Sequence, residues 1–111
     1  AEYDRHILED KQTADIFMIN QQEALQQGVK GTIQDLEVQW AAWSFSLKDI
    51  NVPVYIYQGQ KDTFVPWKFA EHMAHTIPNA ELHLKPEAGH LIPLDPIYQD
   101  EIFSIMLKHT E

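Results

Sequence analysis

The stretch "VPVYIYQGQKDTFVP", residues 52–66, decides the fold class. Residues 54–57 are apolar or aromatic on both faces of an extended chain, which is typical of a strand inside a parallel sheet that is covered by helices. Gly59 then allows the chain to turn sharply, and Pro66 predicts the first turn of a helix, where a missing N–H does no harm. Asp62 lies between the two, and a lone carboxylate at that point needs an explanation.

The rest of the C-terminal half continues the alternation. Residues 66–77 predict a helix, whose apolar face consists of Trp67, Ala70, Met73, Ala74 and Ile77. Residues 80–85, "AELHLK", alternate apolar and polar side chains and predict a half-buried strand near a sheet edge. Asp95 and Pro96 predict the cap and first turn of a final helix, on one side of which lie Tyr98, Ile102, Ile105 and Met106. The order strand, helix, strand, helix predicts an α/β fold with parallel strands.

Residues 1–50 have a different texture and predict a helical segment. Apolar residues recur there at intervals near three and four: Ile7, Ala14, Phe17, Met18, Leu25 and Val29. Gly28 and Gly31 predict a break, after which a second helix spans about residues 32–40 and begins at a threonine or glycine cap. The cluster of Trp40, Trp43 and Phe45 is expected to pack against other apolar groups rather than to face a substrate. We therefore divide the chain into residues 1–50 and residues 51–111.

Two parallel strands are too few for a stable sheet. A strand that is apolar on both faces also needs neighbours on both sides. We therefore expect residues 1–111 to be part of a larger protein, and we expect the isolated chain to complete its sheet by self-association into a homo-oligomer. The alternative is a self-contained small domain of unusual topology.

Composition excludes several classes of partner. The 111 residues carry a formal net charge of −9, which argues against nucleic acid or an anionic membrane surface as a partner, since both require a basic stripe. No apolar run is long enough to span a bilayer. The sequence has no cysteine, so it has no disulfide framework and no thiol nucleophile. In the absence of a recognisable signal peptide, the default expectation is a cytoplasmic protein.

Asp62 follows the first predicted strand, and His90 follows the second. The carboxyl ends of parallel strands meet at one edge of a sheet, where ligands and catalytic groups collect, so we expect the two side chains to be neighbours. A carboxylate beside an imidazole holds the ring in one tautomer and stabilises the imidazolium that forms when the ring takes a proton from a nucleophile. Asp62 is therefore predicted to orient His90, and His90 to act as a general base. Taken singly, each residue also fits an ordinary turn or loop.

The same residues carry a resemblance to a known family. Residues 52–66, together with "IPNAELHLKPEAGHLIP" at residues 77–93, resemble the C-terminal portion of the α/β-hydrolase superfamily. In that superfamily one strand leads to G-x-x-D-x-x-V-P and the next leads to G-H; the matching residues are Gly59, Asp62, Val65 and Pro66, then Gly89 and His90. Residues 24–54 resemble the helical segment that precedes the acid-bearing strand in many members.

The resemblance implies a serine hydrolase that acts on a small-molecule ester or amide without a cofactor, with Asp62 as the triad acid and His90 as the general base. Members carry the nucleophile on a G-x-S-x-G elbow that precedes the acid in the chain, and this sequence has no such elbow. Its serines, none of which we assign as the nucleophile, are Ser44, Ser46 and Ser104. The resemblance thus implies a C-terminal segment that is inactive alone, in which residues 1–50 form a cap or lid.

Alternatives stay open at this point. The chain also fits a non-catalytic scaffold of the same fold that binds a small molecule without turnover. An aspartate in place of the serine would instead indicate a dehalogenase or an epoxide hydrolase. His72 and His75 lie three apart on one predicted helix, and with His83 on the next strand they have a spacing that could bind zinc. Such pairs are also common on exposed helix faces, and we predict no metal site.

Overall fold

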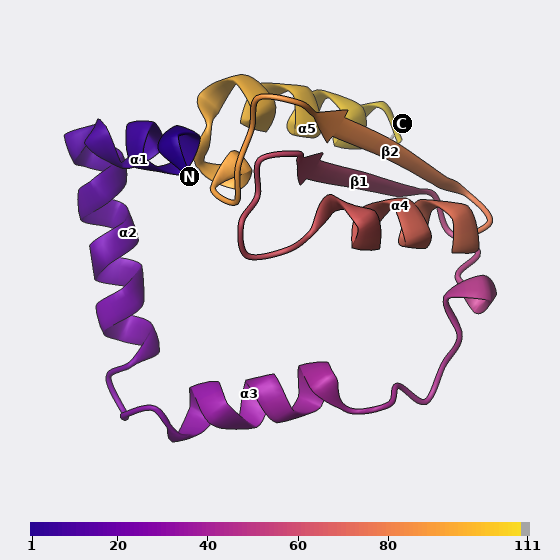
Figure 1. Cartoon of the computed structure of the whole chain (residues 1–111), viewed down its shortest axis with the longest axis horizontal. Coiled ribbons are helices and arrows are strands. Elements are labelled where there is room, and N and C mark those ends of the chain that lie inside the picture. Colours follow the sequence, from indigo (N-terminus) through magenta and orange to yellow (C-terminus); the bar gives the residue numbers. More distant parts are fainter. Residues whose placement is uncertain (110–111) are drawn as a thin grey trace.

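The computed structural model describes residues 1–109 and has an α/β architecture (Figure 1). Its centre is a sheet of two strands, β1 (Val54–Gly59) and β2 (Ala80–Lys85), which are joined by helix α4 (Trp67–Thr76). A short 3-10 helix, η2 (Ile92–Leu94), and helix α5 (Pro96–Lys108) follow β2. The predicted α/β class and the predicted order of strand, helix, strand and helix are confirmed.

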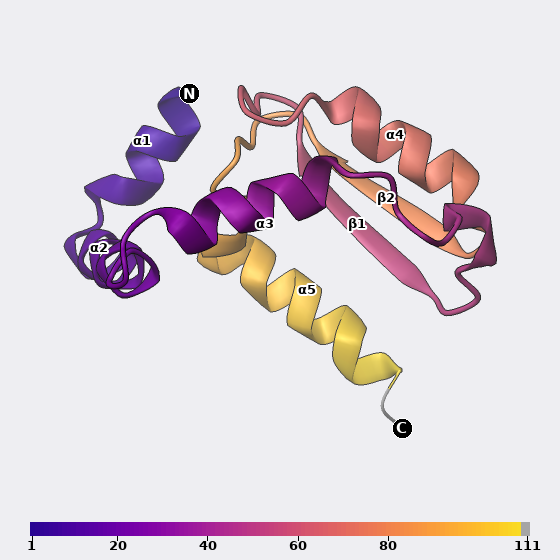
Figure 2. The ribbon, with the colours of Figure 1, turned by 90° about the horizontal axis from the view of Figure 1, so that it is seen from below.

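The two strands are parallel, with Val54 opposite Ala80 at one end and Gly59 opposite Lys85 at the other. Helix α4 packs on one face of the sheet, whereas α5 lies over the other face (Figures 1 and 2). A parallel pair needs such a crossover, because the chain must return to the starting end of the sheet before the second strand begins. Both strands therefore end at the same edge, and the loops that follow them leave the sheet side by side.

The apolar core lies between α4, the sheet and the loop after β2. Ala70 of α4 and its C-cap residue Ile77 are buried, as are Ala88 and Ile92 beyond β2. The other members of the predicted apolar face of α4 are partly buried: Trp67, Met73 and Ala74. That predicted face is confirmed. No large side chain among residues 1–109 is fully buried, so hydrophobic burial stabilises this chain less than is usual for its length.

The helix starts agree closely with the sequence. Pro66 is the N-cap of α4, one position earlier than the first-turn place predicted for it. Pro96 is the first residue of α5, and the Asp95 carboxylate caps that helix by accepting a hydrogen bond from the N–H of Ile97 at 3.0 Å. A side-chain cap of this kind satisfies one of the backbone donors that a helix leaves free at its N-terminus.

The polar face of β2 is more covered than its alternating pattern predicts. The side chains of His83 and Lys85 are mostly buried, because α5 lies over this face. His83 stacks on Tyr57, with 4.6 Å between the ring centroids. Lys85 donates to both carboxylate oxygens of Glu101 in α5, at 2.8 and 3.1 Å, and these bonds lead the interactions that hold the pKa of Glu101 below its usual value. The predicted half-buried strand is observed, since every residue of β2 except Glu81 has intermediate exposure, and α5 covers the polar side chains of His83 and Lys85.

The N-terminal segment contains three helices: α1 (Glu2–Glu9), α2 (Lys11–Ala24) and α3 (Lys30–Trp40). The first two are separated at Asp10, whose carboxylate caps α2 by accepting from the N–H of Thr13 at 2.8 Å. Helix α3 begins at Lys30 without a side-chain cap, so the prediction of a threonine or glycine cap is wrong. A 3-10 helix, η1 (Leu47–Asp49), leads the chain to β1.

Helices α2 and α3 project away from the sheet and leave apolar residues exposed (Figure 1). Trp40 is 81% exposed, and Trp43 and Phe45, which stack on each other with 5.4 Å between centroids, are also exposed. The expectation that this cluster packs against other apolar groups is therefore wrong beyond the Trp43–Phe45 stack. The physical reason is that the sheet and its two helices lie too far from α3 to cover it (Figure 1).

The sheet is open on both sides. Each of its two strands pairs only with the other among residues 1–109, so β1, which is apolar along most of its length, has an unpaired edge. This agrees with the expectation of a partial sheet. None of the helices within residues 1–109 combines the length and the apolar composition that crossing a bilayer requires.

Candidate active site

The loops that follow β1 and β2 are bound to each other at the carboxyl edge of the sheet. The N–H of Gln60 donates to the carbonyl of Lys85, and the N–H of Lys61 donates to the carbonyl of Ala88, both at 2.9 Å. A Cβ on Gly59 would lie 2.4 Å from the carbonyl oxygens of both Ala88 and Gly89. Only glycine permits so close an approach of two backbones, so this position fixes the distance between the two loops.

The carboxylate of Asp62 is held from two directions. Its Oδ1 accepts from the backbone N–H groups of Phe64 at 2.8 Å and Val65 at 2.9 Å. Its Oδ2 lies 3.0 Å from Nδ1 of His90 and accepts from the side-chain amide of Gln58 at 3.3 Å. The side chain is only 6% exposed. The turn between β1 and α4 thus orients the carboxylate so that one of its oxygens faces His90.

The pKa of Asp62 reflects two opposed effects. Burial raises the pKa of its carboxyl group, but the hydrogen bonds from Val65, His90 and Phe64 lower it, and the net result is a pKa below the usual value. Hydrogen bonds to the charged form of an acid favour ionisation in this way. Asp62 is therefore a carboxylate at neutral pH and can accept a hydrogen bond from an imidazole N–H.

His90 combines an anchored nitrogen with an accessible ring. Its Nδ1 faces Asp62, while its side chain is 45% exposed and its ring lies 5.0 Å from the ring of Phe64. When Nδ1 carries the proton that Asp62 accepts, Nε2 of the neutral ring holds a free lone pair. Such an imidazole can take a proton from a neighbouring hydroxyl or water and return it later.

The structure brings the two predicted site residues together, as their positions after successive strands lead one to expect. Sequence reasoning missed Gln58, whose side-chain amide donates both to Asp62 and to the carbonyl of Val65 at 3.1 Å. The only signal for Gln58 is a polar residue at the end of an apolar strand. Sequence reasoning also missed Phe64, because an aromatic residue in a loop does not by itself indicate a place beside the site. Within residues 1–109, no serine is hydrogen-bonded to His90.

The zinc alternative fails on geometry. Within the described residues 1–109, no group of three or more side chains is arranged to hold a metal ion. His72 and His75 are exposed on α4, and Nδ1 of His75 contacts the backbone carbonyl of Glu71 at 2.8 Å. His83 lies on the opposite face of the sheet, where it stacks on Tyr57 and its Nδ1 is 3.8 Å from the carboxylate of Glu101 in α5.

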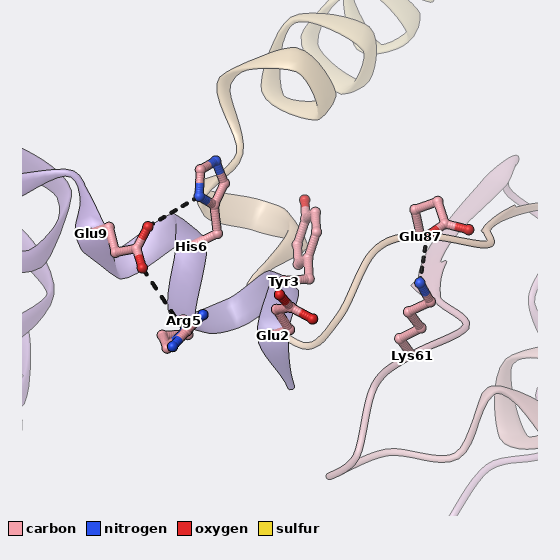
Figure 3. Close-up of a pocket in the computed structure, with 7 residues that line it drawn as sticks. All are labelled: Glu2, Tyr3, Arg5, His6, Glu9, Lys61 and Glu87. Carbon is pink, nitrogen blue, oxygen red and sulfur yellow. Dashed lines mark hydrogen bonds and ion pairs between the residues drawn. The ribbon is translucent and has the colours of Figure 1, made fainter.

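A hollow of about 460 Å³ lies next to this edge, between α1 and the two loops (Figure 3). Glu9 lies 3.2 Å from Nδ1 of His6 and 3.9 Å from Arg5. Across the hollow, Lys61 pairs with Glu87 and so joins the loop of Asp62 to the loop of His90. Because these exposed charges neutralise each other in pairs, the hollow is better explained as a solvated groove than as a substrate pocket.

An ionised acid and a histidine are in contact at the carboxyl edge of a parallel α/β unit. This is the arrangement that the acid and the histidine of a catalytic triad have, without the nucleophile. A family model described as the alpha/beta hydrolase fold matches residues 9–96. The chain therefore belongs to the α/β-hydrolase fold family, and the resemblance seen in the sequence is confirmed. Comparison with curated proteins and with solved structures gave no match.

Proposed function

We propose that this chain supplies the acid and the general base of a serine hydrolase that cleaves a small-molecule ester or amide. The observation that supports the proposal best is the contact between Nδ1 of His90 and Oδ2 of Asp62, at 3.0 Å, with the other oxygen of Asp62 fixed by two backbone N–H groups. Family membership fits this reading, because the acid and histidine motifs both lie within residues 9–96.

In the proposed reaction, Nε2 of His90 takes the proton of the nucleophilic hydroxyl as that oxygen attacks the substrate carbonyl. Asp62 stabilises the resulting imidazolium, and His90 then gives the proton to the leaving group, which leaves an acyl-enzyme. Water attacks the acyl-enzyme with the same assistance from His90, and the acid is released. The nucleophile and the oxyanion hole, which supplies much of the rate enhancement, come from outside these 111 residues.

We further propose that residues 51–111 form the C-terminal α/β segment of the hydrolase and that residues 1–50 form its cap. Two features support this division. Strand β1 is apolar and has an unpaired edge, as a strand inside a wider sheet would have once its neighbour is removed. The exposed apolar residues of α2, of α3 and of the segment after α3 fit a cap that encloses an acyl group, and they include Met18, Trp40 and Trp43.

The isolated chain is expected to self-associate, because its sheet edges and the apolar surfaces of α2 and α3 are uncovered. Light scattering coupled to gel filtration is expected to give a mass above the 12.9 kDa of one chain at micromolar concentration. The mass should fall on dilution while the helical circular-dichroism signal persists. A folded species that stays monomeric throughout the dilution series would contradict this expectation.

A second candidate function is a non-catalytic scaffold of the same fold that binds a small molecule without turnover, and the contact between Asp62 and His90 is compatible with it, because neither residue is a nucleophile. A fluorophosphonate probe separates the two in the complete protein, because it reacts only with an activated serine. The hydrolase predicts covalent labelling of a single serine and loss of labelling in a His90→Ala variant. The scaffold predicts no labelling of the wild-type protein.

A further inference from the structure

Helix α1 contacts the loop that carries His90, although the two are far apart in the sequence. The carboxylate of Asp4 accepts from the N–H of Leu91 at 2.7 Å, and the hydroxyl of Tyr3 donates to Oδ2 of Asp95 at 2.5 Å. Figure 1 shows α1 beside the start of α5, and Figure 3 shows Tyr3 reaching from α1 toward this region. The first helix of the chain is thus bonded to both ends of the segment that runs from His90 to α5.

Asp4 is the buried polar residue of α1, at 8% exposure. Its Oδ1 makes the bond to Leu91, and a Cβ on Gly89 would lie 2.5 Å from Oδ1 and 2.7 Å from Oδ2. The carboxylate therefore touches the residue before His90 and the residue after it. Burying a carboxylate is costly unless its hydrogen bonds compensate, so its position against this loop calls for a reason.

The rest of the loop shows why such a contact matters. The backbone between β2 and Ala88 is held by the loop of Asp62, because the N–H of Lys61 donates a hydrogen bond to the carbonyl of Ala88. Beyond Ala88, the N–H of Leu91 is bound by Asp4. His90 lies between these two anchors, and its own ring is bonded to Asp62 alone among residues 1–109. Asp4 thus fixes the far side of the backbone that carries the histidine.

We propose that Asp4 is a positioning residue for His90: its hydrogen bond to Leu91 and its contact with Gly89 hold the loop so that Nδ1 of His90 stays on Asp62. The catalytic meaning of that geometry rests on the proposed function. Asp4 lies outside the matched residues 9–96, so the proposal concerns a contact of this chain that the family match does not cover. The same contact explains why residue 89 is a glycine, since any larger side chain would collide with the carboxylate of Asp4.

The test compares three substitutions of Asp4 in the complete protein. Asp4→Ala removes the acceptor, Asp4→Leu removes it while keeping a buried side chain of similar size, and Asp4→Asn keeps an oxygen that can accept from Leu91. For Asp4→Ala and Asp4→Leu we expect kcat to fall about 10- to 100-fold with KM nearly unchanged, because a displaced general base slows the chemical step and does not weaken substrate binding. Asp4→Asn is expected to retain most of the wild-type kcat. Glu9→Ala, on an exposed part of the same helix, is the matched control and should leave kcat unchanged.

Hydrogen exchange of the Leu91 amide gives a readout that does not depend on catalysis. We expect this exchange to accelerate in Asp4→Ala and Asp4→Leu but not in Asp4→Asn or Glu9→Ala. The proposal is overturned if the Leu91 amide of Asp4→Leu exchanges as in the wild type and this variant keeps wild-type kcat. It is also overturned if Asp4→Asn loses as much kcat as Asp4→Leu. If His90→Ala proves fully active while Leu91 responds as expected, the proposed function fails but the contact between Asp4 and the loop stands.

The contact with Gly89 supplies a second, independent measurement. Gly89→Ala alone is expected to destabilise the protein in urea unfolding, since its methyl group would meet the carboxylate of Asp4 at 2.5 Å. In an Asp4→Ala background, the three nearest obstructing atoms are gone, so Gly89→Ala should cost less. A double-mutant cycle measures this difference, and equal costs in the two backgrounds would contradict the proposed contact.

Discussion

Replacing His90 with alanine in the complete hydrolase is expected to lower kcat roughly 10⁴-fold, as the loss of a triad member does elsewhere. The reason is that Nε2 of His90 is the proposed acceptor of the nucleophile's proton, and no other imidazole lies at this edge in contact with Asp62 among residues 1–109. KM should change far less than kcat, because the substrate does not need the base in order to bind. Steady-state kinetics with a chromogenic ester would measure both constants.

His72→Ala is the matched control for this experiment, since His72 is an exposed histidine on α4. It should leave kcat and KM unchanged. Added imidazole is expected to restore part of the activity of His90→Ala by occupying the space of the lost ring, and not to affect the His72 variant. Turnover close to wild type in His90→Ala without imidazole would remove His90 from the mechanism.

The acid–histidine pair could be predicted because local patterns were enough to define it. Each residue follows a strand that the sequence predicts clearly, the first from its run of apolar residues and the second from its alternation, and a parallel crossover brings the ends of successive strands to one edge. Asp62 and His90 had therefore to be close once the helix between them was recognised. The same logic predicted the apolar face of α4 and the cap of α5, which depend on residues only a few positions apart.

What the sequence did not reveal depends on contacts between distant segments. The bond from Leu91 to Asp4 joins residues 87 positions apart, and neither residue belongs to a pattern that predicts the other. The covering of His83 and Lys85 by α5 likewise depends on Glu101, which is not among the residues that the sequence predicted on the apolar side of this helix. The exposure of Trp40 was not predicted because large aromatic residues usually pack, whereas no element among residues 1–109 covers this side chain.

Asp62→Asn is expected to be nearly as damaging as the loss of His90, although asparagine has almost the same shape as aspartate. Oδ1 of Asp62 accepts hydrogen bonds from the backbone N–H groups of Phe64 and Val65, so an asparagine must place its oxygen at that position. Its NH₂ group then takes the position of Oδ2 and faces Nδ1 of His90 at about the 3.0 Å of the present contact. A donor at that position favours the tautomer in which Nδ1 is the acceptor and Nε2 carries the proton, which removes the lone pair that the base requires.

The tautomer argument leads to a comparison between two variants. Asp62→Asn should lower kcat roughly 10⁴-fold, whereas Asp62→Ala, which leaves the imidazole free to adopt either tautomer, should lose no more than this despite the smaller side chain. The NMR shifts of the His90 ring nitrogens report the tautomer directly, and in Asp62→Asn they should show the proton on Nε2 at a pH where the ring is neutral. If Asp62→Asn kept the proton on Nδ1 and near-wild-type kcat, Asp62 would not be the residue that orients His90. The carboxylate would then act only as an acceptor for the turn between β1 and α4, a role that asparagine fills equally well through the bonds to Phe64 and Val65.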